Sequence, residues 1–181
     1  MDLVFITGNQ HKADALATWL GRPIKHHKLD LDELQSLDLR TVVAHKARQA
    51  YGIVGQPVLV EDVALTFTGM GRLPGTFVKW FLEEIGNEGL CRLADGLPHR
   101  KAVASVCYAM CDGGEEVYFF DGHVQGLVPA APRGDKGWGW DPSFQPDGSD
   151  KTYGEMTETE VRPFNARARA VEKLKRYLER V

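Results

Sequence analysis

LVFITGNQHKADALATWLG, residues 3–21, is the stretch of sequence that sets the fold class. It begins with a short apolar run, Leu3 to Ile6, which is typical of a buried strand and which the loop TGN interrupts. From His11 onward the apolar residues recur at helical spacing, and Gly21 ends that pattern. The stretch therefore predicts a strand, a tight loop and a helix, which is how an α/β protein opens.

The rest of the chain supplies further elements of both kinds. The apolar patterns predict helices at residues 41–51, 77–85 and 89–95 and from about Asn165 onward, and strands at residues 58–60, 101–110 and 116–128. The first of these strands is expected to end at Glu61-Asp62, and residues 129–148 to form a long ordered loop. An Asp-Gly-Gly turn at residues 112–114 predicts a hairpin, so the sheet is expected to be mixed.

Composition limits the range of functions. The formal net charge of −3 gives no general attraction for nucleic acid or for an anionic membrane. No stretch is apolar enough to cross a bilayer, and the start of the chain lacks the basic residues of a signal peptide. Cys107 and Cys111 would lie too far apart along one strand face to bond, so these two and Cys91 are expected to be reduced. We expect a cytoplasmic protein with a single domain over residues 1–181, because no linker interrupts it.

The first candidate for chemistry is TGNQHK, Thr7 to Lys12, at the junction of strand and helix. Small polar residues leave backbone N–H groups available at the helix start, where the helix dipole favours an anion. Lys12 is unfavourably placed for that dipole, and a bound phosphate would explain its charge. The P-loop pattern is absent. An ordinary solvated junction is the alternative.

The second candidate is the acidic pair Glu61-Asp62, directly after the apolar strand. Carboxylates at a strand end can hold a divalent cation and orient water, as phosphoryl-transfer sites require. Glu33 is a third carboxylate of this kind. A surface pair that caps the loop is the alternative.

The third candidate is GWGWDPSFQPDG, residues 137–148. Two tryptophans beside glycines in a polar loop are suited to stacking on a planar base, or else to anchoring the loop in the core. Further positive charge could come from Lys46, Lys79, Arg133 and Lys136.

The order of these motifs resembles one family. TGNxxK, then LVEDVAL and LPGTFVKWF, then GWGWDPSFQPDG and an arginine-bearing last helix are similar to the inosine triphosphate pyrophosphatases, the Ham1-like non-canonical purine nucleotide pyrophosphatases, especially the eukaryotic type. The resemblance covers nearly the whole chain. It implies an elongated α/β protein with a mixed sheet flanked by helices, two lobes with the nucleotide in a cleft between them, and a homodimer. It also implies Mg²⁺-dependent hydrolysis of ITP, dITP or XTP to the monophosphate and pyrophosphate.

The same resemblance implies a role for each matching residue. Asp62 would activate water, supported by Glu61, and Glu33 and Asp62 would hold magnesium. Substrate would be bound by the phosphate loop with its lysine, by two further lysines, and by residues around the nucleoside: Thr7, Gly8, Asn9, Lys12, Lys46, Val63, Lys79, Trp138, Gly139, Trp140, Asp141, Asn165 and Arg167. Trp138 stands where a stacking Phe is usual.

One segment departs from the family pattern. The family carries Ser-His-Arg at the start of the last helix, whereas this chain reads Asn165-Ala166-Arg167, and the preceding family lysine falls near Val161, beside Arg162. Losing the histidine removes a hydrogen-bonding group from the base pocket, for which Arg162, Asn165 or Arg167 could compensate. We therefore expect hydrolysis to be retained and the base preference to be altered or relaxed. Two alternatives remain open: a Maf-like pyrophosphatase for other modified nucleotides, or a nucleotide-binding paralogue without catalysis.

Overall fold

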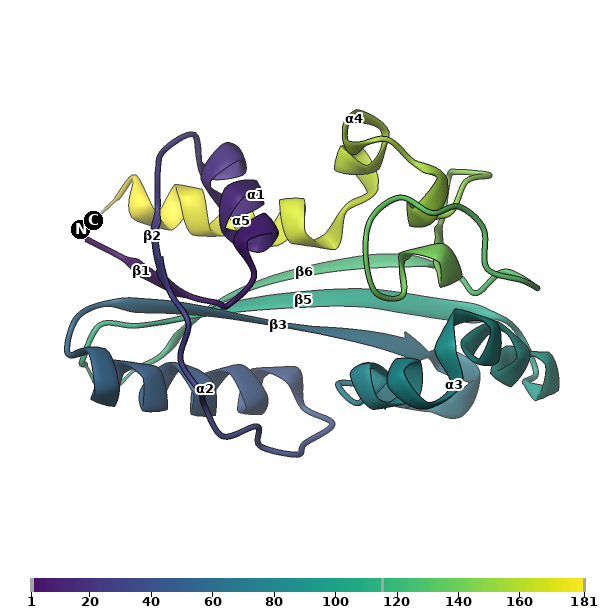
Figure 1. The fold of residues 1–181 in the computed structure, drawn as a ribbon, viewed down its shortest axis with the longest axis horizontal. Coiled ribbons are helices and arrows are strands. Elements are labelled where there is room, and N and C mark those ends of the chain that lie inside the picture. Colours follow the sequence, from purple (N-terminus) through teal and green to yellow (C-terminus); the bar gives the residue numbers. More distant parts are fainter. Residues whose placement is uncertain (1, 115, 181) are drawn as a thin grey trace. The chain divides into compact units, whose positions relative to one another are not determined.

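The strands of this protein form one mixed sheet in the order β2-β1-β3-β5-β6-β7, with β4 beside β3. The structure, a computed structural model, describes residues 2–114 and 116–180 (Figure 1). The chain divides into two compact units, which are described separately. The first contains Met1–Asp62, Val106–Gly122 and Arg167–Val181, and the second contains Val63–Ser105 and His123–Ala166. Strands β3, β5 and β6 contribute residues to both.

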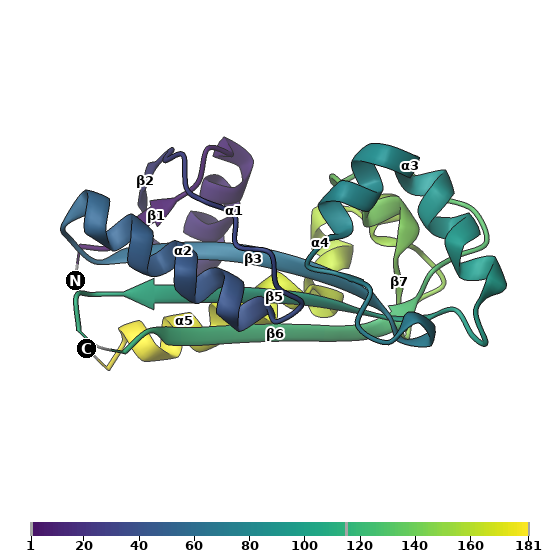
Figure 2. The same cartoon turned by 90° about the horizontal axis from the view of Figure 1, so that it is seen from below.

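The first unit has a sheet with helices on both faces. Its elements are β1 (Val4–Ile6), α1 (Gln10–Leu20), β2 (Lys25–His27), α2 (Leu39–Val54), α5 (Ala166–Leu178) and parts of β3 (Val58–Phe67), β5 (Lys101–Cys111) and β6 (Tyr118–Leu127). Strand β1 pairs parallel with β2 and with β3. Helices α1 and α5 lie on one face and α2 on the other (Figure 1), and the view from below has α2 in front of the strands (Figure 2).

The core beneath α2 explains why that helix forms where it does. Val43, Ala47 and Ala50 recur on one face of α2 and pack against inward-facing residues of the strands. Cys107 and Cys111 belong to the same cluster, and both are free and buried, as is Cys91. The three thiols are thus buried and form no disulfide in the structure, and their reduced state stays a prediction.

The second unit combines the remaining parts of β3, β5 and β6 with short elements. These are β4 (Pro74–Gly75), α3 (Val78–Leu93), β7 (Gln145–Pro146), α4 (Glu158–Val161) and the 3₁₀ turns Thr68–Met70, Ala94–Gly96, Asp141–Ser143, Tyr153–Glu155 and Arg162–Phe164. Strand β4 pairs antiparallel with β3, and β7 with β6. Helix α3 lies on one face of the strands, and α4 with the loops around it lies on the other (Figure 1).

The mixed α/β fold and the helices α1, α2 and α5 are confirmed, and β5 and β6 are neighbours in the sheet. One predicted boundary is wrong. Strand β3 does not end at Glu61-Asp62 but continues to Phe67, because Leu65 and Phe67 are buried. The break predicted between the helices at 77–85 and 89–95 is confirmed, because α3 leaves the helical conformation at Gly86, with φ 64° and ψ −176°, and so consists of two helical segments. The single domain over residues 1–181 stays a prediction.

Within residues 2–114 and 116–180, no helix has the length and apolar character that a membrane span requires.

Candidate active site

The TGN loop leads from β1 into α1 through its own hydrogen bonds. Thr7 Oγ1 accepts from the Asn9 N–H at 3.1 Å, and Asn9 Oδ1 caps the helix by accepting from the Lys12 N–H at 3.3 Å. Gly8 lies against Lys28, whose side-chain carbons would be 3.0 Å from a Cβ at that position. A polar, tightly packed loop thus precedes α1, where the backbone N–H groups favour an anion.

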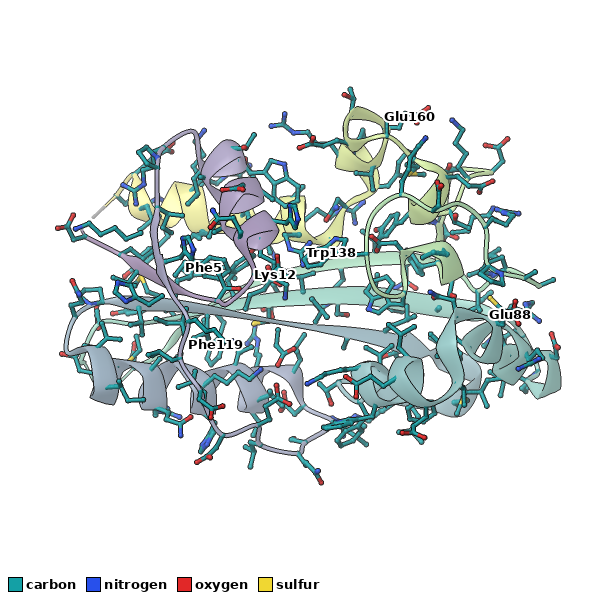
Figure 3. The ribbon with its side chains drawn as sticks, in the orientation of Figure 1. Phe5, Lys12, Glu88, Phe119, Trp138 and Glu160 are labelled. Carbon is teal, nitrogen blue, oxygen red and sulfur yellow. The ribbon has the colours of Figure 1, made fainter. Side chains whose placement is uncertain are left out.

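Glu61 lies at the centre of a buried ion cluster in the first unit. Arg167 on α5 donates to both of its carboxylate oxygens, with Nε at 2.8 Å and Nη2 at 2.9 Å. Lys12 on α1 approaches Glu61 Oε1 at 3.1 Å. The Glu61 side chain is 1% exposed, whereas that of Lys12 is 24% exposed. The two cations and one carboxylate together carry a net positive charge. Lys12, at the start of α1 (Figure 3), is the more exposed of the two cations.

The charges around Glu61 keep it ionised despite its burial. Burial acts to raise its pKa, but the Arg167 and Lys12 charges and the hydrogen bond from Arg167 outweigh this and hold the pKa below its usual value. Tyr108, which the sequence analysis did not select, is buried beside this cluster. Burial, and then the charge of Glu61, raise the pKa of its hydroxyl well above the usual value. The only sequence signal for Tyr108 is its position in the apolar β5 pattern.

Asp62 belongs to a separate cluster with Lys46 and Glu33. Lys46 Nζ on α2 lies 2.7 Å from Asp62 Oδ2 and 3.9 Å from Glu33 Oε1. This group of three side chains carries a net negative charge. It therefore brings two carboxylates close to one partly buried ammonium group.

The two clusters lie on opposite faces of β3. Successive side chains of a strand point to opposite faces, and Glu61 and Asp62 are consecutive in β3. Accordingly, Glu61 meets α1 and α5, while Asp62 meets α2. The sequence analysis grouped the two carboxylates as one acidic centre, and the structure does not bring them together.

The carboxylates of Glu33 and Asp62 are suited to a magnesium ion bound together with a nucleotide. Among the residues that the structure describes, no group of three or more His, Cys, Asp or Glu is arranged to hold a metal. Mg²⁺ in nucleotide sites needs only one or two carboxylates, because water and substrate phosphates supply its other oxygen ligands. Glu33 and Asp62, which flank one ammonium group at 3.9 and 2.7 Å, fit that requirement.

The two tryptophans of the second unit differ in environment. Trp140 is half-buried against Phe144 and Tyr153, with ring centroids at 5.9 and 6.3 Å, so it anchors its loop. Trp138 is 40% exposed (Figure 3), and its backbone N–H donates to Asp141 Oδ2 at 2.8 Å. Trp138 therefore remains the candidate stacking surface.

Three more residues that the sequence analysis selected, Val63, Lys79 and Asn165, also belong to the second unit. Lys79 Nζ lies 5.0 Å from the ring centroid of Trp80, and Val63 is half-buried on β3. The Asn165 N–H donates to the Arg162 carbonyl at 3.3 Å, and Ala166 is buried.

Arg133 and Lys136, considered for extra positive charge, join two loops of the second unit. Arg133 donates to Glu155 at 3.1 Å and to Gln145 at 2.8 Å, and Lys136 Nζ donates to the Glu155 carbonyl at 3.1 Å.

Comparison with known proteins places the chain in a family. The Ham1 family model matches residues 3–177, and this protein belongs to that family. It is 40% identical to inosine triphosphate pyrophosphatase 2 of Trypanosoma cruzi over 96% of this chain and 90% of the relative. It is 39% identical to inosine triphosphate pyrophosphatase of Schizosaccharomyces pombe over 98% of this chain and 95% of that protein.

Solved structures agree on the fold. A Ham1 protein from Coxiella burnetii matches with a TM-score of 0.88 and 22% identity, over 99% of this chain and 98% of that one. The Ham1 protein of Staphylococcus aureus matches with a TM-score of 0.85 and 21% identity, over the same shares.

Proposed function

We propose that this protein is a magnesium-dependent nucleoside triphosphate pyrophosphatase that converts ITP, dITP or XTP to the monophosphate and pyrophosphate. Support comes from its relatives, which are named inosine triphosphate pyrophosphatases and match nearly the whole chain. The structural observation that carries the proposal is the pair of clusters on β3. Consecutive residues there hold a partly exposed lysine on one face and two carboxylates on the other. The pairing of β1 with β3 extends only to Leu59, so a triphosphate that passes round this edge of β3 would reach both clusters.

The reaction is attack by water on the α-phosphorus, which forms one P–O bond and breaks the bond to the pyrophosphate leaving group. Lys12 and the start of α1 bind phosphate oxygens and stabilise charge on the leaving group. Asp62 orients the water and accepts its proton, and Lys46 holds that carboxylate in place at 2.7 Å. Magnesium, held by Glu33 and Asp62, would supply charge neutralisation at the phosphates.

Base recognition belongs to a different set of residues. The exposed Trp138 ring offers a surface for a planar base. Ala166, where the family has a histidine, is buried and has no side-chain hydrogen-bonding group, while Arg167 makes two hydrogen bonds to Glu61. We therefore propose that the preference among bases differs from that of the relatives.

The test is pyrophosphate release from ITP, XTP, their deoxy forms, the standard nucleotides and modified purines, each with magnesium and again with EDTA. The expected result is EDTA-sensitive release that is fast for inosine and xanthine nucleotides and extends to other bases. Fast release from inosine and xanthine nucleotides alone would contradict the proposed change in base preference. Fast release only from other modified nucleotides would favour the Maf-like alternative or a changed base preference. Binding without release across the panel would contradict catalysis.

The proposal also includes a homodimer, as the family resemblance implies, and a cytoplasmic location. The support for that location is the set of three free, buried cysteines.

A further inference from the structure

Asn87 lies at the kink of α3, close to residues 137–143, the loop segment of the second unit that contains Trp138 and Trp140. Gly86 leaves the helical conformation at φ 64° and ψ −176°, and the helix resumes after it. Because φ is positive there, a side chain at position 86 would be strained, which makes glycine the favoured residue. The kink places Asn87 beside the loop segment 137–143, a contact that a regular helix pattern does not predict.

The Asn87 side chain uses both of its ends on this segment. Its Nδ2 donates to the Gly139 carbonyl at 3.0 Å, between the two tryptophans. Its Oδ1 accepts from the Ser143 hydroxyl at 2.6 Å, and Ser143 is completely buried. The helix is thus joined to both the middle and the end of the segment.

The segment is also closed on itself around Trp138. The Trp138 N–H donates to Asp141 Oδ2 at 2.8 Å, and the Asp141 N–H donates back to the Trp138 carbonyl at 3.2 Å. Gly137 permits this, because a Cβ there would lie only 2.1 Å from Asp141 Oδ2. The only large side chain that this closed segment leaves exposed is Trp138, at 40%.

We propose that Asn87 is a positioning residue that fixes the orientation of Trp138 for stacking on the substrate's base. This rests on the proposed function and deepens it, because it assigns control of base binding to a residue of α3 that lies about fifty positions earlier in the chain. Asn87 acts through the loop and does not itself touch the reacting atoms.

Kinetics with ITP provide the first test. Asn87→Ala is expected to raise KM about tenfold with a much smaller change in kcat, because two hydrogen bonds that orient the loop are lost. Asn87→Asp keeps the acceptor for Ser143 but loses the donor to Gly139, so it should show the same kind of change and serves if the alanine variant folds poorly. Glu88→Gln, at the exposed neighbouring position (Figure 3), is the matched control and should behave as wild type.

A double-mutant cycle separates positioning from general structural damage. In a Trp138→Ala background, Asn87→Ala should change kcat/KM by no more than about twofold, since the ring that it positions is absent. An equal loss of kcat/KM in both backgrounds would overturn the proposal.

Hydrogen exchange of the nucleotide-free protein tests the inference independently of activity. Amides of residues 137–143 should exchange faster in Asn87→Ala than in wild type or Glu88→Gln, while the strands stay protected. Unchanged exchange in that segment would overturn the positioning role even in an active enzyme. If the Asn87→Ala variant exchanges faster but the wild-type protein hydrolyses no triphosphate, the contact between Asn87 and the loop is supported. That result would instead contradict the proposed function.

Discussion

Glu61 and Asp62 are adjacent in the sequence but have different surroundings in the structure. Glu61 is enclosed by Arg167 and Lys12, and its two oxygens are occupied by one guanidinium. Asp62 faces Lys46 and Glu33 and remains partly exposed. A buried, fully paired carboxylate is suited to holding cations in place, whereas a partly exposed one can meet water and a metal ion.

Replacing Asp62 tests the assignment of the base. Asp62→Asn should reduce kcat for pyrophosphate release by about 10²–10⁴-fold, because the amide cannot accept the proton of the attacking water. The melting temperature should change little. Asp32→Asn, an exposed aspartate that contacts Gln49, is the matched control and should keep full activity. An Asp62→Asn enzyme with wild-type kcat would show that another group activates the water.

Replacing Glu61 tests the structural role of its cluster. Glu61→Gln should lower the free energy of unfolding at pH 7 by about 3–5 kcal/mol, because Arg167 and Lys12 lose their counter-charge in a buried place. Urea titration measures this value. Glu160→Gln, in an exposed pair with Lys151, should cost far less, since solvent screens that pair.

The shifted pKa of Glu61 should also make the stability of the protein depend on pH. The pKa of Glu61 is lower in the folded protein than its usual value near 4.5, so its stabilisation is present above that pH and is lost as the pH falls below it. Unfolding free energies measured between pH 7 and pH 3 should therefore fall less steeply for Glu61→Gln than for wild type. Equal slopes would mean that other carboxylates cause the acid sensitivity.

At the scale of elements, regular periodicity predicted the main helices and the kind of sheet, but not the full length of β3. The helical spacing in α1, α2 and α5 and the mixed sheet could be predicted, because apolar spacing reports burial directly. The continuation of β3 through Glu61-Asp62 could not, because the cations that pair with these two charges come from α1, α2 and α5, which are distant in the sequence. The interruption of α3 at Gly86 could also be predicted, as the gap between two helical patterns.

The loops of the second unit are held by backbone contacts that a side chain would prevent. Gly134, at φ 84°, lies where a Cβ would be 2.0 Å from the Gly154 carbonyl oxygen. Gly134→Ala should therefore lower the melting temperature clearly more than Gly21→Ala, which shares a positive φ but has open space around it. Thermal unfolding followed by circular dichroism compares them. Similar losses would mean that the loop can shift to accept the methyl group.

At the scale of the whole molecule, motif order predicted the family, and the family model and relatives bear this out. The list of candidate site residues also came from the sequence, but their grouping did not. Which carboxylate pairs with which lysine depends on the face of β3 from which it projects. Asn87 and Tyr108 carried no motif, because the contacts of Asn87 follow from the break at Gly86, and Tyr108 is one residue of the apolar β5 pattern.

The proposed homodimer predicts the molecular mass of the protein in solution. Light scattering on a size-exclusion column should give twice the 20.2 kDa of one chain at micromolar concentration. Asp62→Asn should elute identically, since that change affects the reaction and not assembly. A mass of one chain would contradict the dimer.

The alternation along β3 has a consequence for how this sequence can change over generations. The gain or loss of one residue just before Glu61 would exchange the two carboxylates between the faces of β3. The buried arginine would then meet the aspartate, and the lysine of α2 would meet the glutamate. If the residue gained or lost is uncharged, the net charge would be unchanged, yet both the Glu61 cluster and the pairing of Asp62 with Lys46 would be lost together. Length variation among descendants of this chain should therefore be found in its loops, while this strand keeps its count.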